Sequence, residues 1–221
     1  MPIQRLSLFA PLPARHLETF VAVVQTLTTE RLNQFKTITY VYKDETSAQG
    51  RRASDFLRLR EDRSTTANDP IDDAQNKSPA QVLEVIDAPE MNKRPVTSRI
   101  VHIVPCHAGD AKKLASSMGY LLSFAYYEQG YSLTIGSVSL RVYQVFQARK
   151  KAVDESMNGN AQAEEMEGVA IGDGSTWIVH ADIEVSTGSP DDLKKGTDEL
   201  VRLKKELQGY VELSPLLDEL R

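Results

Sequence analysis

Two acidic residues, Asp182 and Glu184, stand two positions apart in a stretch rich in β-branched residues. Side chains at positions i and i+2 of a strand point to the same face, so the two carboxylates would lie side by side. Carboxylate oxygens arranged in this way bind divalent cations. Arg58 and Arg60 share a strand face in the same manner, and guanidinium groups bind phosphate oxygens. Together the four residues indicate the chemistry of a metal-dependent phosphohydrolase.

The beginning of the chain argues against that chemistry. The layout resembles that of the triphosphate-tunnel hydrolases, whose hallmark is a Glu-x-Glu-x-Lys strand near the N-terminus. Here the first expected strand, Gln4–Phe9, carries no acidic residue. We therefore favour the interpretation that the four charges lie on the solvated faces of half-buried strands. A triphosphate-tunnel phosphohydrolase that uses Asp182 and Glu184 remains the second hypothesis, and we assign no catalytic residue.

Other residues with ligand or nucleophile chemistry form no recognisable site. Zinc prefers ligands such as His102, Cys106 and His107, but these three are crowded together and no fourth ligand follows at a typical spacing. The alternative places His102 on a strand and the Cys-His pair at the start of a loop. No serine stands in a Gly-x-Ser-x-Gly elbow, and no phosphate-binding loop is present. We therefore expect neither a metal nor a cofactor.

Tyrosine is concentrated in one block of the chain. Tyr126, Tyr127, Tyr131 and Tyr143 fall within eighteen positions of an aromatic and β-branched segment. Tyrosine is enriched at protein interfaces because its ring is apolar and its hydroxyl can hydrogen-bond. The four residues are therefore candidates for partner binding. An ordinary barrel wall with tyrosine rings at its mouth explains them equally well.

Composition limits the classes of function. The chain has 221 residues, a net charge of −5 and 41% hydrophobic residues, which are ordinary values for a globular protein with a substantial core. The acidic balance argues against wholesale attraction to nucleic acid or to an anionic membrane. The N-terminal stretch matches neither a secretory signal nor a transit peptide. A single cysteine, Cys106, suits a reducing compartment. We expect a soluble protein of the cytosol or nucleus.

Most of the elements that must position these residues are strands. Nine segments are rich in β-branched and aromatic residues or alternate in polarity, as strands do. They are Gln4–Phe9, Thr37–Tyr42, Asp55–Arg60, Val82–Ile86, Arg99–Val104, Tyr120–Tyr127, Ser132–Ile135, Val138–Phe146 and Thr176–Val185. Pro11 and Pro13 are expected to end the first strand, and turns are expected at Gln129-Gly130 and Gly136-Ser137.

Three segments have the spacing of helices. Apolar residues recur at helical spacing from Leu17 to Leu27. Asp110 can cap a short helix that ends at Gly119, with Ala111, Leu114, Ala115 and Met118 on one face. The third helix has the most complete signals, with Ser189 as the cap, Pro190 at the first position and a stop at Gly209. Gly196 inside it costs about 1 kcal/mol relative to alanine. A short strand, Tyr210–Leu213, should follow.

These elements predict one domain over residues 1–221. The fold class is mainly β, an antiparallel barrel with about three flanking helices, because closure removes the edges of a sheet. Two polar segments, 61–80 and 150–168, bury too little apolar surface to offset their ordering entropy and are expected to be mobile loops. Residues 214–221 are expected to form a loose tail.

Four stretches of this chain occur in an order and spacing that resemble a known family. They are Leu6-Ser7-Leu8-Phe9, Met118–Gly130, Leu140–Gln147 and Leu203–Leu213. Together they resemble subunit 18 of the Mediator complex, a head-module protein of eukaryotic transcription, and look most like the fungal members. The most specific piece is the run Leu203-Lys204-Lys205-Glu206-Leu207-Gln208-Gly209-Tyr210. The resemblance extends from about residue 4 to residue 213.

The resemblance implies a non-catalytic transcription coregulator of the nucleus. Its fold would be an antiparallel barrel similar in shape to the triphosphate-tunnel barrels. It would pair with Mediator subunit 20, a related barrel, and a helix of Mediator subunit 8 would tether it to the other head subunits. The assembly would contact RNA polymerase II, and this subunit would bridge regulators and polymerase through protein–protein contacts without sequence-specific binding to nucleic acid.

Overall fold

The computed structural model describes residues 2–44, 56–63, 80–90, 94–106, 110–150, 166–171, 174–186 and 189–215. Within them, the strands are β1 (Pro2–Pro13), β2 (Asn33–Asp44), β3 (Phe56–Asp62), β4 (Gln81–Ile86), β5 (Thr97–Cys106), β6 (Tyr120–Ile135), β7 (Val138–Lys150), β8 (Met166–Ala170) and β9 (Thr176–Ser186). The helices are α1 (Leu17–Thr26), α2 (Ala111–Ser117) and α3 (Pro190–Glu206), with a short 3₁₀ helix η1 (Ala14–His16) before α1.

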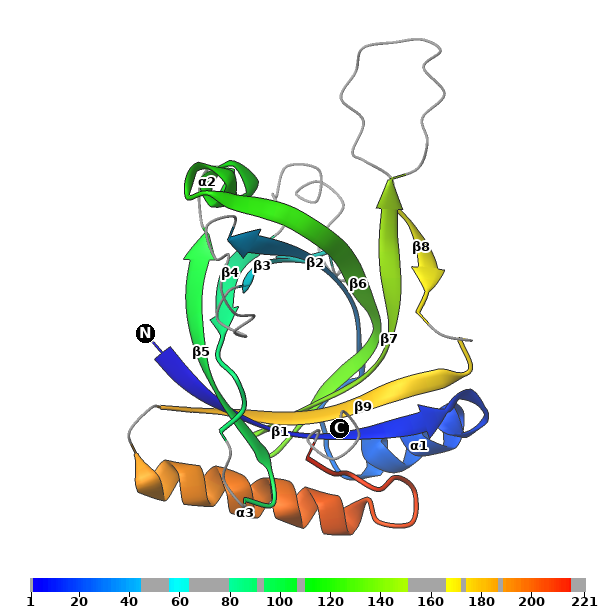
Figure 1. The fold of residues 1–221 in the computed structure, drawn as a ribbon. Coiled ribbons are helices and arrows are strands. Elements are labelled where there is room, and N and C mark those ends of the chain that lie inside the picture. Colours follow the sequence, from blue (N-terminus) through cyan, green and yellow to red (C-terminus); the bar gives the residue numbers. More distant parts are fainter. Residues whose placement is uncertain are drawn as a thin grey trace, which may run out of the picture.

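Eight strands close into an antiparallel barrel. Their order is β6-β2-β3-β4-β5-β1-β9-β7, and pairing between β6 and β7 completes the ring. The short strand β8 pairs with β7 and extends the sheet outside the ring (Figure 1). The three α-helices lie against the outside of this wall. The expected fold class is therefore confirmed.

The barrel is apolar outside and polar inside. On β1, Leu6 and Leu8 are fully buried in the outer core, whereas their neighbours Arg5 and Ser7 line an interior cavity. This alternation follows from the period of two along a strand. The sequence pattern was consistent with either face turning inward, and the helices decide the matter because they cover the apolar face.

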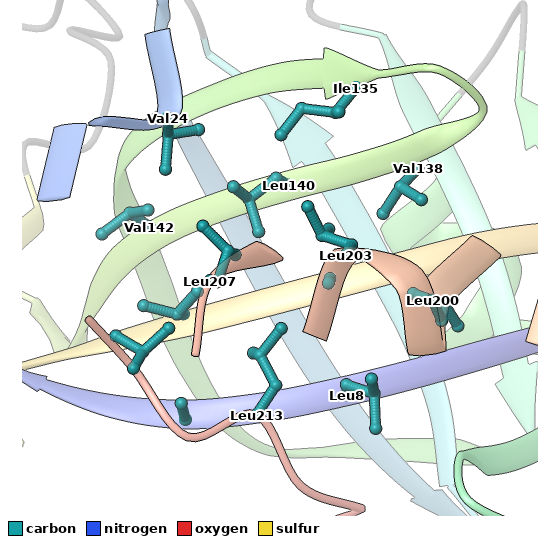
Figure 2. Close-up of a cluster of buried hydrophobic side chains, with 14 of the residues drawn as sticks. Leu8, Val24, Ile135, Val138, Leu140, Val142, Leu200, Leu203, Leu207 and Leu213 are labelled. Atoms are coloured by element: carbon teal, nitrogen blue, oxygen red, sulfur yellow. The ribbon is translucent and has the colours of Figure 1, made fainter. Parts of the chain in front are cut away.

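The larger outer core lies beneath α3 and the segment that follows it. Figure 2 shows Leu200, Leu203 and Leu207 packed among Leu8 of β1 and Leu140 of β7. All five side chains are 2% exposed or less. Burial of a leucine side chain contributes about 1.5–3 kcal/mol, so this layer is a main source of stability. The apolar stripe of α3 is thus occupied by the barrel wall.

Helix α3 begins and packs as its sequence indicates. The Ser189 hydroxyl accepts a hydrogen bond from the Asp192 N–H, and Pro190 occupies the first turn. The structure explains why a glycine stands at position 196 inside the helix. A Cβ there would lie 3.1 Å from Leu6 Cδ1 and 3.3 Å from Val185 Cγ1. The glycine weakens the isolated helix but allows it to approach the barrel closely.

A smaller core lies beneath α2. Ala111 and Ala115 pack against Tyr40 and Tyr42 of β2, on the outer side of the wall. The Asp110 carboxylate accepts hydrogen bonds from the N–H groups of Lys112 and Lys113, so the expected helix cap is present. Two residues expected on the buried face are exposed instead, since Leu114 and Met118 have exposed fractions of 48% and 50%.

The expectation that prolines end the first strand is wrong. β1 continues to Pro13, and Pro11 and Pro13 pair in register with Ile178 and Thr176 of β9. Phe9 directs its N–H away from β9, toward Ser214, and residues two and four positions later point to the same edge. The pairing of β1 with β5 ends at Ser7, so β5 does not cover this edge of β1 beyond that residue. Proline is tolerated there because no partner strand needs its missing N–H.

The expected turn at Gln129-Gly130 is also wrong. β6 runs unbroken from Tyr120 to Ile135, and only Gly136-Ser137 forms a turn. Gly130 lies opposite Tyr143 of β7, and a Cβ at this position would be 2.1 Å from the Val142 carbonyl oxygen. This glycine allows two strands to approach closely. From the sequence alone, a glycine in this role cannot be distinguished from a glycine in a turn.

The boundaries of the two polar segments and of the tail differ from expectation. Glu61 and Asp62 belong to β3, and Glu61 is buried, where it accepts a hydrogen bond from Gln81. Residues 64–79 and 151–165, which carry most of the two expected loops, lie outside the described residues. The expected strand Tyr210–Leu213 is a turn and an irregular stretch, and Ser214 forms a β-bridge with Phe9. Residues 216–221 also lie outside the described part.

Candidate functional site

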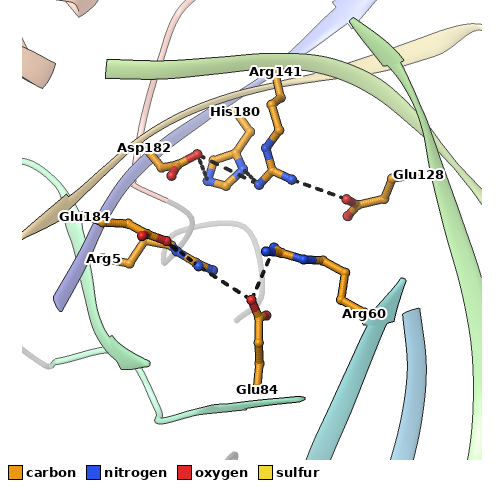
Figure 3. Close-up of polar contacts among 8 residues, drawn as sticks. All are labelled: Arg5, Arg60, Glu84, Glu128, Arg141, His180, Asp182 and Glu184. Atoms are coloured by element: carbon orange, nitrogen blue, oxygen red, sulfur yellow. Dashed lines mark hydrogen bonds and ion pairs between the residues drawn. The ribbon is translucent and has the colours of Figure 1, made fainter. Parts of the chain in front are cut away.

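The interior of the barrel, which we call the lumen, gathers charged residues from most strands. Figure 3 shows seven of them together with His180, and the arginines lie beside carboxylates. Interior positions are set by register, because Arg5, Ser7 and Phe9 of β1 lie opposite Glu184, Asp182 and His180 of β9. The charges are therefore brought together by strand pairing between distant parts of the chain, and the expectation that Asp182 lies on a solvated face is wrong.

Arg141 on β7 is the centre of one charged network. Its guanidinium lies 3.5 Å from the Glu128 carboxylate and 3.9 Å from the Asp182 carboxylate. It also lies 2.8 Å from Nδ1 of His180, which accepts the hydrogen bond when the ring is neutral. Burial raises the pKa of Glu128 and of Asp182, and the charge of Arg141 opposes that rise. Burial, followed by Arg141, lowers the pKa of His180 well below its ordinary value.

A second network joins four strands, β1, β3, β4 and β9, on the other side of the lumen. Arg5 donates to Glu184 at 2.6 Å, and its guanidinium lies 3.8 Å from the Glu84 carboxylate. Arg60 lies 3.2 Å from the same Glu84 oxygen. Asp182 and Glu184 do share one face, as the sequence indicated, but arginines neutralise both of them. Among the described residues, no three His, Cys, Asp or Glu side chains form a group that could hold a metal ion.

The geometry of this lumen does not favour the phosphohydrolase hypothesis. A divalent cation needs several free oxygen ligands, and the carboxylates here already contact guanidinium groups. The Asp182 Oδ1 atom is buried and 3.8 Å from His180 Nε2, without a hydrogen bond between them. Burial raises the pKa of Asp182, so the charged form that binds metals is less favourable here than in water.

The suggested zinc ligands do not come together in the described structure. His102 is exposed on β5 and lies 3.9 Å from the Asp87 carboxylate. Cys106 is a free thiol at the end of the same strand. His107 lies outside the described residues.

The four tyrosines are divided among three environments. Tyr126 and Tyr143 line the lumen. Tyr127 is buried on the outer side, where its ring stacks on Phe146 at 4.8 Å between centroids. Tyr131 stacks on Trp177 and lines an open groove of about 250 Å³. The structure therefore does not gather them at one surface, and of the four only Tyr131 lines this open groove.

A feature that sequence reasoning missed lies at the start of β6. Five large apolar side chains between α2 and the first residues of β6 are each about half exposed, and we call them the apolar rim: Leu114, Met118, Leu121, Leu122 and Phe124. Within the described part of the chain, β6 pairs only with β2 before Tyr126, where its pairing with β7 begins. Exposed apolar side chains beside an open strand edge are typical of a docking site for another protein. The aromatic and β-branched residues of this segment predicted a strand of the barrel, but they did not indicate that its apolar side chains are exposed.

Comparisons with known proteins agree on family and fold. A family model described as Med18 protein matches residues 4–218. A chain in the Mediator head module of Schizosaccharomyces pombe has a TM-score of 0.73 at 20% identity, and the match covers 96% of this chain and 98% of that one. A search of the curated proteins finds no match.

Two prokaryotic structures share the fold at lower similarity. A protein of Pyrococcus horikoshii has a TM-score of 0.58 at 12% identity over 95% of this chain and 93% of that one. An adenylate cyclase candidate from Vibrio parahaemolyticus has a TM-score of 0.53 at 13% identity over 94% of this chain and 90% of that one.

Among the described residues, no helix combines the length and apolar character that crossing a membrane requires.

Proposed function

The chain belongs to the Med18 protein family and is therefore a Mediator subunit; from this premise we propose that it is a non-catalytic bridge within the head module. In this role it connects regulators with RNA polymerase II through protein–protein contacts, and it works in the nucleus. The family match over residues 4–218 carries the proposal, because it spans nearly the whole chain. The similarity to a chain of a yeast head module supports the same assignment.

The charged lumen supports a role without catalysis. Its carboxylates are neutralised by arginines, and Asp182 and Glu184 contribute no free pair of ligands. The family likewise points to a subunit that is not an enzyme. The proposed function then depends on contacts with other subunits, and these partners bind the outer surface of the barrel.

We assign the apolar rim to Mediator subunit 20, the proposed pairing partner. Each rim residue is about half exposed, and hiding such side chains from water stabilises a complex. The open edge of β6 adds unpaired backbone groups to the same region. A strand of a related barrel can pair with such an edge while its side chains cover the leucines.

Co-expression with subunits 20 and 8 tests both the role and the surface. The parent chain is expected to co-purify with both subunits. The Leu121→Asp/Leu122→Asp variant is expected to recover at least tenfold less subunit 20, because two charges would be buried in an apolar contact. A parent chain that elutes alone would contradict the proposed role.

A matched variant separates loss of docking from a general effect of added charge. Val169→Asp/Ile171→Asp also places two aspartates at exposed apolar positions, on and just after β8. It is expected to retain subunit 20. If the rim variant also retained subunit 20 in full, the docking surface would lie elsewhere while the subunit role would stand.

Tyr131 is the tyrosine that we propose as a partner contact, with the helix of subunit 8 as the partner. It lines its groove with Phe35 and Trp177, whose rings can pack against a helix, and Lys36 and Arg63 add positive charge to the same groove. Tyr131→Ala is expected to lower the recovery of subunit 8 several-fold and to leave subunit 20 bound. If Tyr131→Ala recovered both subunits in full, Tyr131 would not belong to the interface. The amounts of subunits 8 and 20 that co-purify with each variant provide the measurement.

A further inference from the structure

One end of the lumen contains more positive than negative charge. A cavity of about 150 Å³ lies there, and we call it the arginine chamber. Its charged lining consists of five arginines and two glutamates: Arg5, Arg58, Arg60, Arg99, Arg141, Glu84 and Glu128. His180 also lines it but is neutral, because its pKa is lowered well below the ordinary value.

Only some of these arginines have a carboxylate partner. Arg5, Arg60 and Arg141 pair with Glu184, Glu84 and Glu128 at 2.6, 3.2 and 3.5 Å. Within the described residues, neither Arg58 nor Arg99 has a carboxylate at ion-pair distance. Arg58 lies opposite Glu84 in the β3–β4 register, yet that carboxylate already contacts two other guanidinium groups. Arg58 and Arg99 are therefore the two chamber arginines without an ion-pair partner among the described residues.

Strand register makes the excess charge unfavourable. Arg99 of β5 is directly opposite Arg5 of β1, and like charges at directly opposed positions destabilise a sheet. The pKa of Arg99 is lowered by burial first and then by the charges of Arg58 and Arg5. The barrel therefore holds Arg99 close enough to Arg58 and Arg5 for their charges to repel, and an anion bound among them would relieve that repulsion.

We propose that the arginine chamber binds a small phosphate-type oxyanion, held chiefly by Arg58 and Arg99. Guanidinium groups form two parallel hydrogen bonds to phosphate oxygens, and this geometry distinguishes arginine from lysine. The hydroxyl groups of Ser7 and Tyr126 line the same cavity and add possible donors. The proposal concerns binding alone and is independent of the role within Mediator.

The size of the chamber selects the ligand class. A volume of about 150 Å³ corresponds to roughly five water molecules and is below the usual volume of a site for a drug-sized ligand. Inorganic phosphate and pyrophosphate are of the right scale. The larger neighbouring cavity shares Arg5, Arg60 and Arg141 with the chamber, so the terminal phosphates of a nucleotide are a second source of the same chemistry.

Thermal unfolding and calorimetric titration of the full chain test the proposal. Pyrophosphate is expected to raise the unfolding temperature saturably at constant ionic strength, because a ligand that binds the folded state stabilises it. The Arg58→Gln/Arg99→Gln variant is expected to bind at least tenfold more weakly. In chloride alone its unfolding temperature should equal or exceed that of the parent, since the repulsion is removed.

Two comparisons make the result decisive. Arg31→Gln/Arg202→Gln removes the same net charge from exposed positions and is expected to keep the pyrophosphate response. The proposal would be overturned if the parent chain did not bind pyrophosphate. It would also be overturned if both double variants responded equally, because a general salt effect does not depend on the chamber. Competition between pyrophosphate and a nucleoside triphosphate would support one site open to both sources, whereas nucleotide binding that persists in Arg58→Gln/Arg99→Gln would contradict it.

Discussion

Replacing Arg141 by methionine is expected to lower the free energy of unfolding at neutral pH by about 3–5 kcal/mol, the usual cost of removing one partner from a buried charged network. The side chain of Arg141 is 22% exposed, and it faces Glu128 and Asp182, whose side chains are 16% and 10% exposed. Methionine fills similar space but supplies no charge. The two carboxylates would then be buried without compensation, and chemical denaturation measures the loss.

The loss should depend on pH in a definite direction. Burial already raises the pKa of Glu128 and Asp182 above their ordinary values of 4.5 and 3.8, and removing Arg141 raises each pKa further. A carboxyl with a raised pKa binds its proton more tightly in the folded state, so it favours folding at low pH and disfavours it as pH rises through the folded pKa. The pKa of His180 also rises without Arg141, which eases the cost of its protonation in acid. The deficit of the variant should shrink as pH falls from 7 toward 4.

An exposed arginine provides the control. Arg202 forms an ion pair with Glu206 at 3.5 Å on the surface of α3, with side chains 64% and 40% exposed. Exposed pairs contribute little because water screens them, so Arg202→Met should lower stability by less than about 1 kcal/mol without the pH trend. Equal losses for the two variants, or a deficit that grows in acid, would refute the role given to Arg141.

The second large effect is expected from Gly130→Ala. A Cβ on Gly130 would lie 2.1 Å from the Val142 carbonyl oxygen and 2.7 Å from the Tyr143 Cα. Both atoms belong to the backbone of β7, so no side-chain rotation can relieve the clash. The β6–β7 pairing that closes the barrel would have to separate locally, and overpacking of this kind costs about 3 kcal/mol or more. The midpoint of urea unfolding should fall accordingly.

The neighbouring residue shows whether the effect belongs to the glycine. Gln129 is exposed on the same strand, and Gln129→Ala should change stability by less than about 0.5 kcal/mol. A Gly130→Ala variant as stable as Gln129→Ala would mean that the two strands approach less closely than the structure indicates.

Local sequence patterns were sufficient to predict most of the helices and strands and the family. Local rules were sufficient for helix α3, since Ser189, Pro190 and the leucine spacing act within a few residues of one another. Alternation likewise identified most strands and correctly placed Asp182 and Glu184 on one face. The family resemblance came from the order of short segments, and the family model over residues 4–218 confirms it.

The contacts of each strand face depend on packing between distant segments, which local patterns do not contain. The charged residues of β3, β7 and β9 lie in the lumen because α1, α2 and α3 cover the apolar outer face. The contacts of Arg141 with Glu128 and Asp182 join residues 13 and 41 positions away in the chain. Gly130 likewise resembles a turn residue until β7 lies beside it. Alternation has a period but no direction, so the sequence predicts that a strand has two faces while only packing between distant segments determines which face turns inward.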